Sequence, residues 1–385
     1  MTDRWNTPER VALRESVAAF TRDQIAPHMD EWEDAGQLPR ELHAQTAKAG
    51  FLGIGFDESV GGEGGDLIDI SVVTEAIVEN GGSTGLLASL FTHGIAVPHI
   101  IDSGNRDLID RYVRPTLAGE TIGSLGVTEP GGGSNVAGIT TRAVKDGDHY
   151  IVNGAKTFIT SSVRADFVTT AVRTGEDGHG GISLLVIDTD TPGFTVCRSL
   201  RKMGWHCSDT GELAFDDVRV PAANLVGEEN GGFYLVMQQF VNERLTLAVQ
   251  SYATAQRALD LAVSYARERE TFGRPLISRQ VIRHKLVDMH RRTEAARALT
   301  RQAVERAQDS GNRADPQLIL AAAMAKNQAV EAVEWVVSEA VQIHGGMGYM
   351  RESEIDRHYR DARILGIGGG ATEVLNDLAA KLLGY

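Results

Sequence analysis

Cysteine is scarce in this sequence, which contains only Cys197 and Cys207. Two cysteines cannot build a disulfide framework or a cysteine-rich metal cage. They lie close enough in sequence to pair, but we expect both to be reduced structural thiols. The histidines, among them His93 and His99, also lack a ligand spacing such as HxxxH on one helix, so we expect no metal site.

Long hydrophobic runs are missing as well. No uninterrupted apolar stretch approaches the roughly 18 residues of a membrane-spanning helix. The N-terminal segment lacks the apolar core of a signal peptide. The sequence therefore predicts a soluble, cytoplasmic protein with no membrane span.

Positive charge is in deficit, because 38 Lys and Arg residues stand against 52 Asp and Glu residues, for a formal net charge of −14. A general nucleic-acid-binding protein needs a concentrated basic surface, so this balance argues against one. Local binding of phosphate groups, through arginine and backbone N–H groups, remains compatible with it.

What the chain does contain is a three-part pattern of apolar residues, within a length of 385 residues that allows two or three domains. Residues 1–121 repeat apolar positions at helical spacing, after a helix start at Thr7-Pro8. Residues 122–227 carry short runs rich in Val, Ile, Thr and Phe, which are typical of strands. Residues 228–385 return to helical spacing. We predict an α+β fold with an N-terminal α-helical domain, a middle antiparallel β domain and a C-terminal α-helical domain.

Turn and cap residues mark the ends of individual elements. Asp146-Gly147 and Asn153-Gly154 each have the composition of a β-hairpin turn. Asp315-Pro316 predicts the start of a long helix, and Gly345-Gly346 predicts its end.

A glycine-rich segment, residues 127–135, follows the first strand-like run. Glycines allow close approach to a flat or phosphorylated ligand, and the hydroxyls of Thr128 and Ser134 can meet carbonyl or phosphate oxygens. Taken alone, the segment is more often a plain surface turn. It fits neither GxGxxG nor GxxxxGK[ST], which argues against a Rossmann or P-loop nucleotide site.

Further segments occur with it in one succession, and their order carries more information than any one of them. They are TEPG at 128–131, KTFIT at 156–160, RETFG at 269–273, QIHGG at 342–346 and DAR at 361–363. In this succession the chain resembles the acyl-CoA dehydrogenase family nearly end to end. The resemblance implies that the C-terminal domain is a four-helix bundle. It also implies one FAD per subunit and a homotetramer, arranged as a dimer of dimers.

The same resemblance implies which residues contact the flavin ring and the neck of the substrate channel. They are Leu125, Val127, Thr128 and Ser134 on one side, with Phe158 and Thr160 against the other. Many relatives carry Trp where this chain has Phe158, so stacking is expected with less contact area.

For the rest of the cofactor, the resemblance implies contacts from two later regions. Arg269, Phe272 and Gln280 would reach the FAD of a neighbouring subunit, where the arginine fork suits a pyrophosphate. The adenosine portion would meet Gln342, Gly345 and Gly346, with Ala371 and Glu373 on the same side. Ala371 stands where Thr is usual, so one hydroxyl contact is expected to be missing.

The catalytic base departs from the commonest family pattern. Many members carry the base just before a Gly-Thr pair near the C-terminus, but the matching residue here is Gly369. Isovaleryl-CoA and long-chain acyl-CoA dehydrogenases hold it instead near the start of the first long C-terminal helix, in a segment like the present NERL, which makes Glu243 the candidate. The alternative is a Glu that merely pairs with Arg244 in the helix's first turn, where the helix dipole favours it.

The resemblance thus implies α,β-dehydrogenation of a saturated acyl-CoA to trans-2-enoyl-CoA. Glu243 would take the α-proton, while Ser134, Arg244, Gly369 and Gly370 bind the substrate. Electrons would pass from FAD to an electron-transferring flavoprotein. The base position favours long-chain or branched acyl groups. An acyl-CoA oxidase, or a non-catalytic subunit that binds FAD or CoA, stays open as an alternative.

Overall fold

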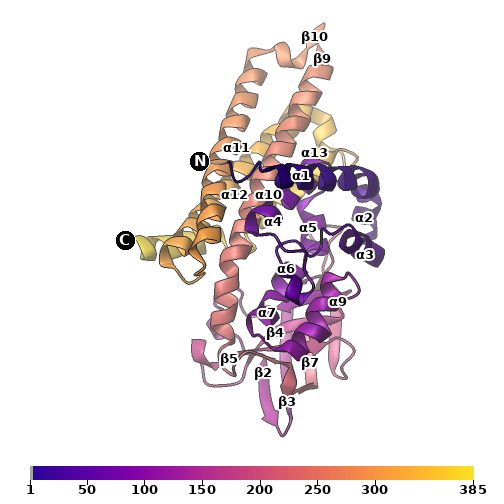
Figure 1. The fold of residues 1–385 in the computed structure, drawn as a ribbon. Coiled ribbons are helices and arrows are strands. Elements are labelled where there is room, and N and C mark those ends of the chain that lie inside the picture. The colour runs from indigo at the N-terminus through magenta and orange to yellow at the C-terminus, as the bar shows by residue number, and fades with distance from the viewer. Residues whose placement is uncertain (1–2) are drawn as a thin grey trace.

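The computed structural model describes residues 3–385, which form two helical parts and a β-sheet that lies at one end of the molecule (Figure 1). The first part is helical as predicted, and Thr7 caps its first helix by accepting a hydrogen bond from the Arg10 N–H. Asp66 and Asp69 form a capping box at the start of α4. The helices of this part are α1 (Pro8–Phe20), α2 (Met29–Ala35), α3 (Arg40–Lys48), α4 (Leu67–Glu79), α5 (Thr84–Leu90), α6 (His93–Ala96), α7 (Pro98–Asp102), α8 (Arg106–Leu108) and α9 (Arg114–Leu117).

The middle part is a β-sheet with the strand order β6-β7-β3-β2-β4-β5-β8. Most neighbouring strands run antiparallel, as predicted, but β1 pairs with β4 in parallel and β2 meets β4 through one parallel residue pair. The strands are β1 (Gly123–Gly126), β2 (Arg142–Asp146), β3 (His149–Thr160), β4 (Phe167–Arg173), β5 (Ile182–Asp188), β6 (Phe194–Ser199), β7 (Thr210–Pro221) and β8 (Leu225–Val226).

One of the two predicted hairpins is wrong. Asp146-Gly147 does connect β2 to β3. Asn153-Gly154 instead lies inside β3, where the pairing with β7 shifts its register between Val152 and Gly154. Gly154 has φ +147°, and a Cβ there would lie 2.6 Å from the Thr141 hydroxyl oxygen. A bulge next to Thr141 therefore requires the glycine, and the strand continues.

The C-terminal part is built on three long helices that run side by side, α10 (Gly232–Glu268), α11 (Gln280–Ser310) and α12 (Pro316–His344) (Figure 1). α13 (Glu354–Leu365) and α14 (Thr372–Leu383) pack on α12. As predicted, Asp315 caps α12 and Gly345 ends it. A short hairpin of β9 (Glu270–Thr271) and β10 (Arg274–Pro275) joins α10 to α11 at the end farthest from the large sheet.

α10 and α12 meet along faces that are rich in small residues. Ala248 and Ala253 of α10 lie in one buried cluster with Ala325 and Ala329 of α12. Ala258 and its neighbours farther along α10 meet valines of α12 in a second cluster. Small side chains allow the two helix backbones to approach closely.

The connections between the parts are short. α9 ends at Leu117 and β1 begins at Gly123, while β8 ends at Val226 and α10 begins at Gly232. The predicted limits at 121/122 and 227/228 fall in these connections. Within residues 3–385, no single helix has the length and apolarity of a membrane span, although the bent pair Thr84–Leu90 and His93–Asp102 meets both criteria together.

Candidate active site

Glu243 lies inside α10, about three turns beyond its first residue, Gly232. Glu243 therefore lies farther from the start of its helix than predicted, and the N-terminal helix dipole, which acts within the first turn, does not explain the residue. Arg244 offers no simple pairing either, because its Nε lies 3.4 Å from the Gly369 carbonyl oxygen, to which it donates. Among the described residues, no cation lies within ion-pair distance of the Glu243 carboxylate.

The Glu243 carboxylate meets the loop between α13 and α14. A Cβ built on Gly369 would lie 3.6 Å from Glu243 Oε1. The two positions that sequence comparison offers for a catalytic base therefore converge on one place. Burial raises the pKa of Glu243, while the charges of Arg244 and Lys326 act in the opposite direction. A half-buried carboxyl with a raised pKa suits proton abstraction near neutral pH.

Gly369 cannot carry a side chain without disturbing this site. Its φ is +62°, and an added Cβ would lie 2.4 Å from Leu247 Cδ1. Among the described residues, the Gly369 and Gly370 N–H groups donate to no protein acceptor. The loop therefore offers free backbone donors beside Glu243, as a thioester carbonyl oxygen requires.

We expect Gly369→Ala to lower the free energy of unfolding by about 2–3 kcal/mol, because left-handed backbone costs about 1–2 kcal/mol and the contact with Leu247 adds to it. Gly311→Ala is the matched control, since Gly311 has φ +58° and nothing within 4 Å of an added Cβ. Urea unfolding of both variants measures the difference. Equal losses would mean that Leu247 moves aside freely.

On the β-sheet side, two predicted cofactor segments lie next to each other. The Thr157 N–H donates to the Thr128 carbonyl at 2.9 Å, which joins the glycine-rich loop to β3. The Ser124 hydroxyl donates to the Thr160 carbonyl at 2.5 Å, which joins β1 to the same strand. Leu125, Val127, Thr128, Phe158 and Thr160 are thereby gathered at one end of β1 and β3.

Phe158 is held in an unusual state. It has φ +60°, which is uncommon for a bulky residue, and its side chain is 68% exposed. Strained backbone of this kind gathers at ligand sites. The exposed ring can therefore stack on a flat ligand.

The glycine-rich loop leaves room for a ligand. Nothing lies within 4 Å of a Cβ added to Gly131 or Gly132, and Ser134 is exposed beside them. An open backbone, free hydroxyls and an exposed aromatic ring fit an isoalloxazine ring with its ribityl chain. The residues present therefore fit a flavin here.

A buried ion pair supports this loop, and sequence analysis did not predict its role. Lys156 is fully buried, and its Nζ donates to Glu129 Oε1 at 2.8 Å and to the Val127 carbonyl at 3.1 Å. Glu129 also accepts from the Thr140 and Thr141 N–H groups. The pair fixes the backbone that leads into Thr128.

The remaining predicted cofactor residues lie elsewhere. Arg269 and Phe272 belong to the β9–β10 hairpin, where the Phe272 side chain is 97% exposed, and Gln280 is exposed at the start of α11. The 37 residues of α10 separate this hairpin from the sheet, a length of about 55 Å. The hairpin with Phe272 therefore lies at the opposite end of α10 from the sheet that carries Phe158.

Gln342, Gly345 and Gly346 are exposed at the end of α12. The neighbouring His344 ring stacks on Tyr265 of α10 with centroids 4.5 Å apart, so this region lies on the hairpin side of the molecule. Ala371 and the exposed Glu373 lie at the start of α14, just after the Gly369 loop.

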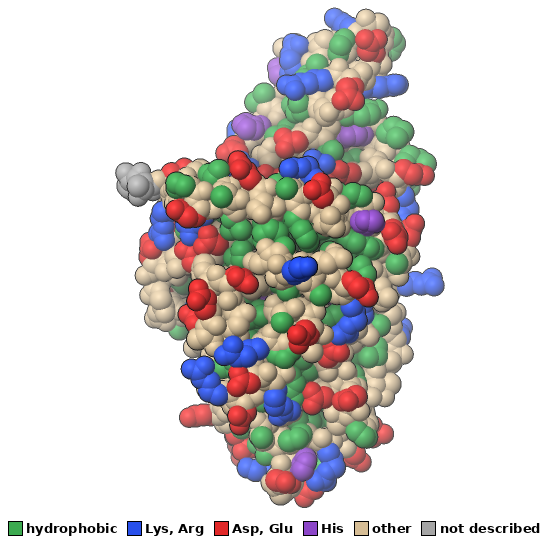
Figure 2. Space-filling model, turned by 45° about the vertical axis from the view of Figure 1, so that its right-hand side comes forward, with side chains coloured by type: hydrophobic (Ala, Val, Ile, Leu, Met, Phe, Trp, Pro, Cys, Tyr) green, Lys and Arg blue, Asp and Glu red, His purple; other side chains and the backbone are tan. Residues whose placement is uncertain are grey.

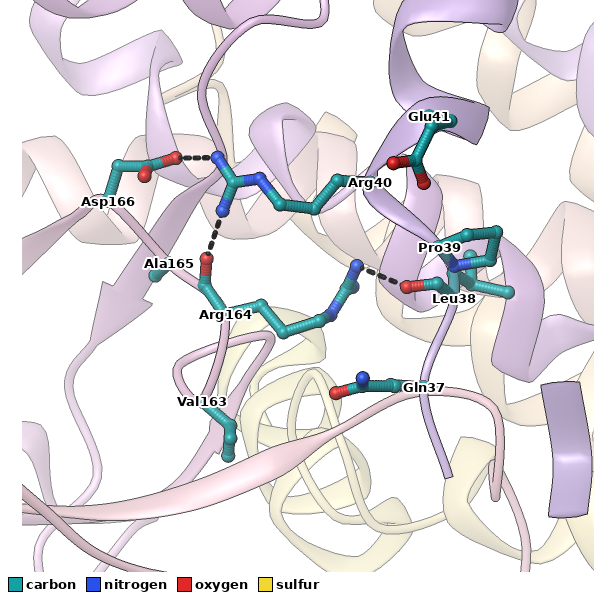
Figure 3. A pocket seen from close by; sticks show the side chains of 9 residues that line it. All are labelled: Gln37, Leu38, Pro39, Arg40, Glu41, Val163, Arg164, Ala165 and Asp166. Carbon is teal, nitrogen blue, oxygen red and sulfur yellow. Dashed lines mark hydrogen bonds and ion pairs between the residues drawn. The ribbon is translucent and has the colours of Figure 1, made fainter. Parts of the chain in front are cut away.

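A surface hollow between α3 and the β3–β4 connection lies apart from Glu243 (Figure 3). Its two arginines are already paired, since Arg40 contacts Asp166 at 2.6 Å and Arg164 contacts Asp209 at 2.7 Å. Arg164 also donates to the Leu38 carbonyl. These contacts tie the first helical part to the sheet and leave neither arginine of the hollow free for a ligand.

The face shown in Figure 2 carries Lys and Arg side chains scattered among Asp and Glu side chains. They do not gather into a basic patch on that face. It therefore offers no concentrated positive surface to a polyanion.

Family models of known proteins match most of the chain. Family models match residues 7–120 as the N-terminal domain, 124–218 as the middle domain and 230–384 as the C-terminal domain of acyl-CoA dehydrogenase. The mouse mitochondrial long-chain specific acyl-CoA dehydrogenase is 36% identical over 97% of this chain and 86% of its own length. The bovine mitochondrial isobutyryl-CoA dehydrogenase is 34% identical over 94% of this chain and 86% of its own length.

Solved structures agree in fold. A probable acyl-CoA dehydrogenase of Mycobacterium abscessus is 63% identical, with a TM-score of 0.97 over 99% of this chain and all of its own. A glutaryl-CoA dehydrogenase of Mycobacterium smegmatis in complex with FADH2 is 26% identical, with a TM-score of 0.91 over 99% of this chain and 96% of that one. A chain in a structure of the electron-transferring flavoprotein of Acidaminococcus fermentans is 33% identical, with a TM-score of 0.93 over 99% of both chains.

Proposed function

The chain belongs to the acyl-CoA dehydrogenase family of FAD-dependent oxidoreductases, and we propose that it dehydrogenates a saturated acyl-CoA with Glu243 as the base. The observation that carries the proposal is the place of the Glu243 carboxylate. It is half-buried beside the free N–H groups of the Gly369 loop. The same environment that raises its pKa keeps an α-proton acceptor out of bulk water.

In the proposed reaction, the Gly369 loop binds the thioester carbonyl oxygen and so acidifies the α-carbon. Glu243 takes the α-proton and holds it on a carboxylate oxygen. FAD, when bound, supplies the chemistry that accepts a hydride from the β-carbon. Leu125, Val127, Thr128, Ser134, Phe158 and Thr160 would hold the flavin end of the cofactor. Arg244 and Gly370 support the substrate loop next to Glu243.

The position of Glu243 favours long-chain or branched acyl groups as substrates. The similarity to the mouse long-chain enzyme and the bovine isobutyryl-CoA enzyme supports this choice. An anaerobic panel of saturated acyl-CoAs, from short to long and including isobutyryl and isovaleryl thioesters, tests it through bleaching of the flavin absorbance. A panel in which only short straight-chain thioesters bleach the flavin would contradict it.

We propose an electron-transferring flavoprotein as the electron acceptor. The similarity to a chain in such a flavoprotein's structure supports this assignment. The reduced enzyme should be reoxidised by the acceptor flavoprotein without oxygen and should produce little peroxide in air. Rapid peroxide formation with no transfer to the flavoprotein would favour an oxidase.

The subunit is proposed to work in a homotetramer in which a neighbour completes each FAD site. The exposed Phe272 and the length of α10 support this arrangement, because the hairpin lies at the opposite end of α10 from the sheet that carries Phe158. Sedimentation of the yellow protein measures the assembly. A cytoplasmic location is part of the same proposal, and cell fractionation checks it.

Arg269→Ala is expected to weaken FAD retention by about ten- to a hundredfold, because a charge-assisted bidentate contact to phosphate contributes about 1.5–3 kcal/mol. Arg267→Ala is the matched control, since Arg267 is also exposed, in the last turn of α10. The FAD-to-protein ratio after gel filtration measures the effect. Equal retention in both variants would remove Arg269 from the cofactor site.

A further inference from the structure

Lys326 is a charged residue in an apolar place. It lies in α12 between Ala325 and Ala329, and its side chain has no exposed surface. Among the described residues, no carboxylate lies within ion-pair distance of its Nζ. A buried ammonium without a direct carboxylate partner destabilises a fold unless other groups satisfy it. Apolar packing therefore does not explain why a lysine occupies this position.

The groups that satisfy Lys326 belong to the loop beside Glu243. Its Nζ donates to the Gly368 carbonyl at 2.8 Å and to the Gly370 carbonyl at 2.6 Å. Arg244 holds the Gly369 carbonyl between them at 3.4 Å. Two cations, one from α10 and one from α12, thus fix successive carbonyls of one glycine loop.

Holding a carbonyl also fixes the next N–H group. The carbonyl of one residue and the N–H of the following residue lie in a single planar peptide unit and point in opposite directions. The contact of Lys326 with the Gly368 carbonyl therefore sets the direction of the Gly369 N–H. Glycine has little intrinsic preference for one backbone direction, so Gly369 and Gly370, both at positive φ, depend on such contacts for their orientation.

We propose that Lys326 is a positioning residue for this dehydrogenation, because its ammonium aims the Gly369 N–H at the thioester oxygen and its charge favours the ionised form of Glu243. The proposal rests on Glu243 acting as the base. It adds a residue that touches neither substrate nor flavin and acts through the loop and the carboxylate.

Two charged side chains shift the pKa of Lys326. The charged groups that act on it are Glu243 and Arg244, both of α10. Burial lowers the pKa of Lys326 to about 8, and the negative charge of Glu243 opposes that shift. Arg363 and Glu334, which lie beside Gly366, pair with each other at 2.7 Å. At neutral pH the cation therefore persists and stabilises the Glu243 carboxylate.

Lys326→Gln tests the charge, because an amide still donates to carbonyl oxygens but is neutral. Without the charge, the pKa of Glu243 rises further, so less of it is ionised at a given pH. The acid limb of kcat/KM against pH is expected to move upward by about one unit. Flavin bleaching by the best acyl-CoA of the panel, followed in stopped flow across pH, measures this limb.

Lys326→Met tests the loop. It removes both hydrogen bonds from Nζ to the loop carbonyls. We expect kcat to fall by about ten- to a hundredfold while KM changes little, because the contact of the Gly369 N–H strengthens as negative charge develops on the thioester oxygen. Asn327→Leu is the matched control. Asn327 is the next residue of α12, and it donates to the Thr372 carbonyl at 3.0 Å and to Asn376 Oδ1 at 2.8 Å, both in α14. It should lose stability and keep the wild-type acid limb.

A folded Lys326→Gln protein with the wild-type acid limb would overturn the proposal, whether or not Lys326→Met folds. A shift of equal size in Asn327→Leu would also overturn it, because the effect would then be general loosening. If Glu243→Gln still bleaches the flavin at the wild-type rate, the base itself is wrong. If Glu243→Gln is inactive and only the Lys326 shift is missing, this inference alone fails.

Discussion

Replacing Glu243 by Gln is expected to abolish substrate-dependent bleaching of the flavin while the protein keeps its FAD and its fold. The amide has nearly the same shape but cannot accept the α-proton. A positioned general base contributes about 10²–10⁴-fold, so a loss within this range is expected. Stopped-flow bleaching with saturating acyl-CoA gives the rate, and the flavin absorbance after gel filtration gives the retained cofactor.

Glu268→Gln is the control for this prediction. Glu268 is the last residue of the same helix, is exposed and accepts a hydrogen bond from the Ser264 hydroxyl at 3.1 Å. It should bleach at the wild-type rate. Residual activity in Glu243→Gln close to that of Glu268→Gln would show that another group takes the proton. Failure of the wild-type protein to bleach with any acyl-CoA would instead favour a non-catalytic FAD- or CoA-binding subunit.

Replacing Lys156 by Met is expected to lower the free energy of unfolding by about 3–5 kcal/mol, because it leaves the Glu129 carboxylate buried without its cation. Lys156 is fully buried and Glu129 is 6% exposed. Urea unfolding at neutral pH measures the loss. Lys145→Met, at an exposed position of β2, should change stability by no more than about 0.5 kcal/mol.

The same pair predicts an acid dependence of stability. The Lys156 ammonium and the donors around it hold the pKa of Glu129 at about 2, below its usual 4.5. Its contribution to stability is therefore complete above about pH 4.5 and is lost as the pH falls towards 2. A Lys156→Met loss below about 1 kcal/mol at neutral pH would mean that water or another cation replaces the lysine.

The sequence predicted the elements whose signals are local. Thr7-Pro8 and Asp315-Pro316 open helices where expected, since a cap and a proline act on their own turn. The hairpin predicted at Asn153-Gly154 was wrong because a tertiary contact determines the glycine there. A side chain at Gly154 would clash with Thr141, which lies on another segment. Glu243 was placed too near a helix start because its helix begins as early as Gly232. A Cβ at Gly232 would lie 2.6 Å from the Ser183 backbone, so the close approach to β5 explains the glycine there.

The candidate site was predictable where a side chain takes part in the reaction directly, as is proposed for Glu243. It was not predictable where a residue acts through another segment's backbone. Lys326 donates hydrogen bonds to carbonyls that lie 42 and 44 residues away in sequence. No rule of residue spacing connects positions so far apart. A signal did exist, because a single lysine inside the alanine-rich stretch AAAMAKNQAV is out of place on an apolar face. That signal indicates burial but does not name the partner.

The alanine-lined contact between α10 and α12 limits how this protein can be changed. Glu243 belongs to one of these helices and Lys326 to the other, so the separation of the helix axes sets the separation of the two charges. Bulkier side chains at Ala248 or Ala329 would push the axes apart, even if they buried more apolar surface. Larger side chains along this contact would therefore lower turnover even where they raise the melting temperature.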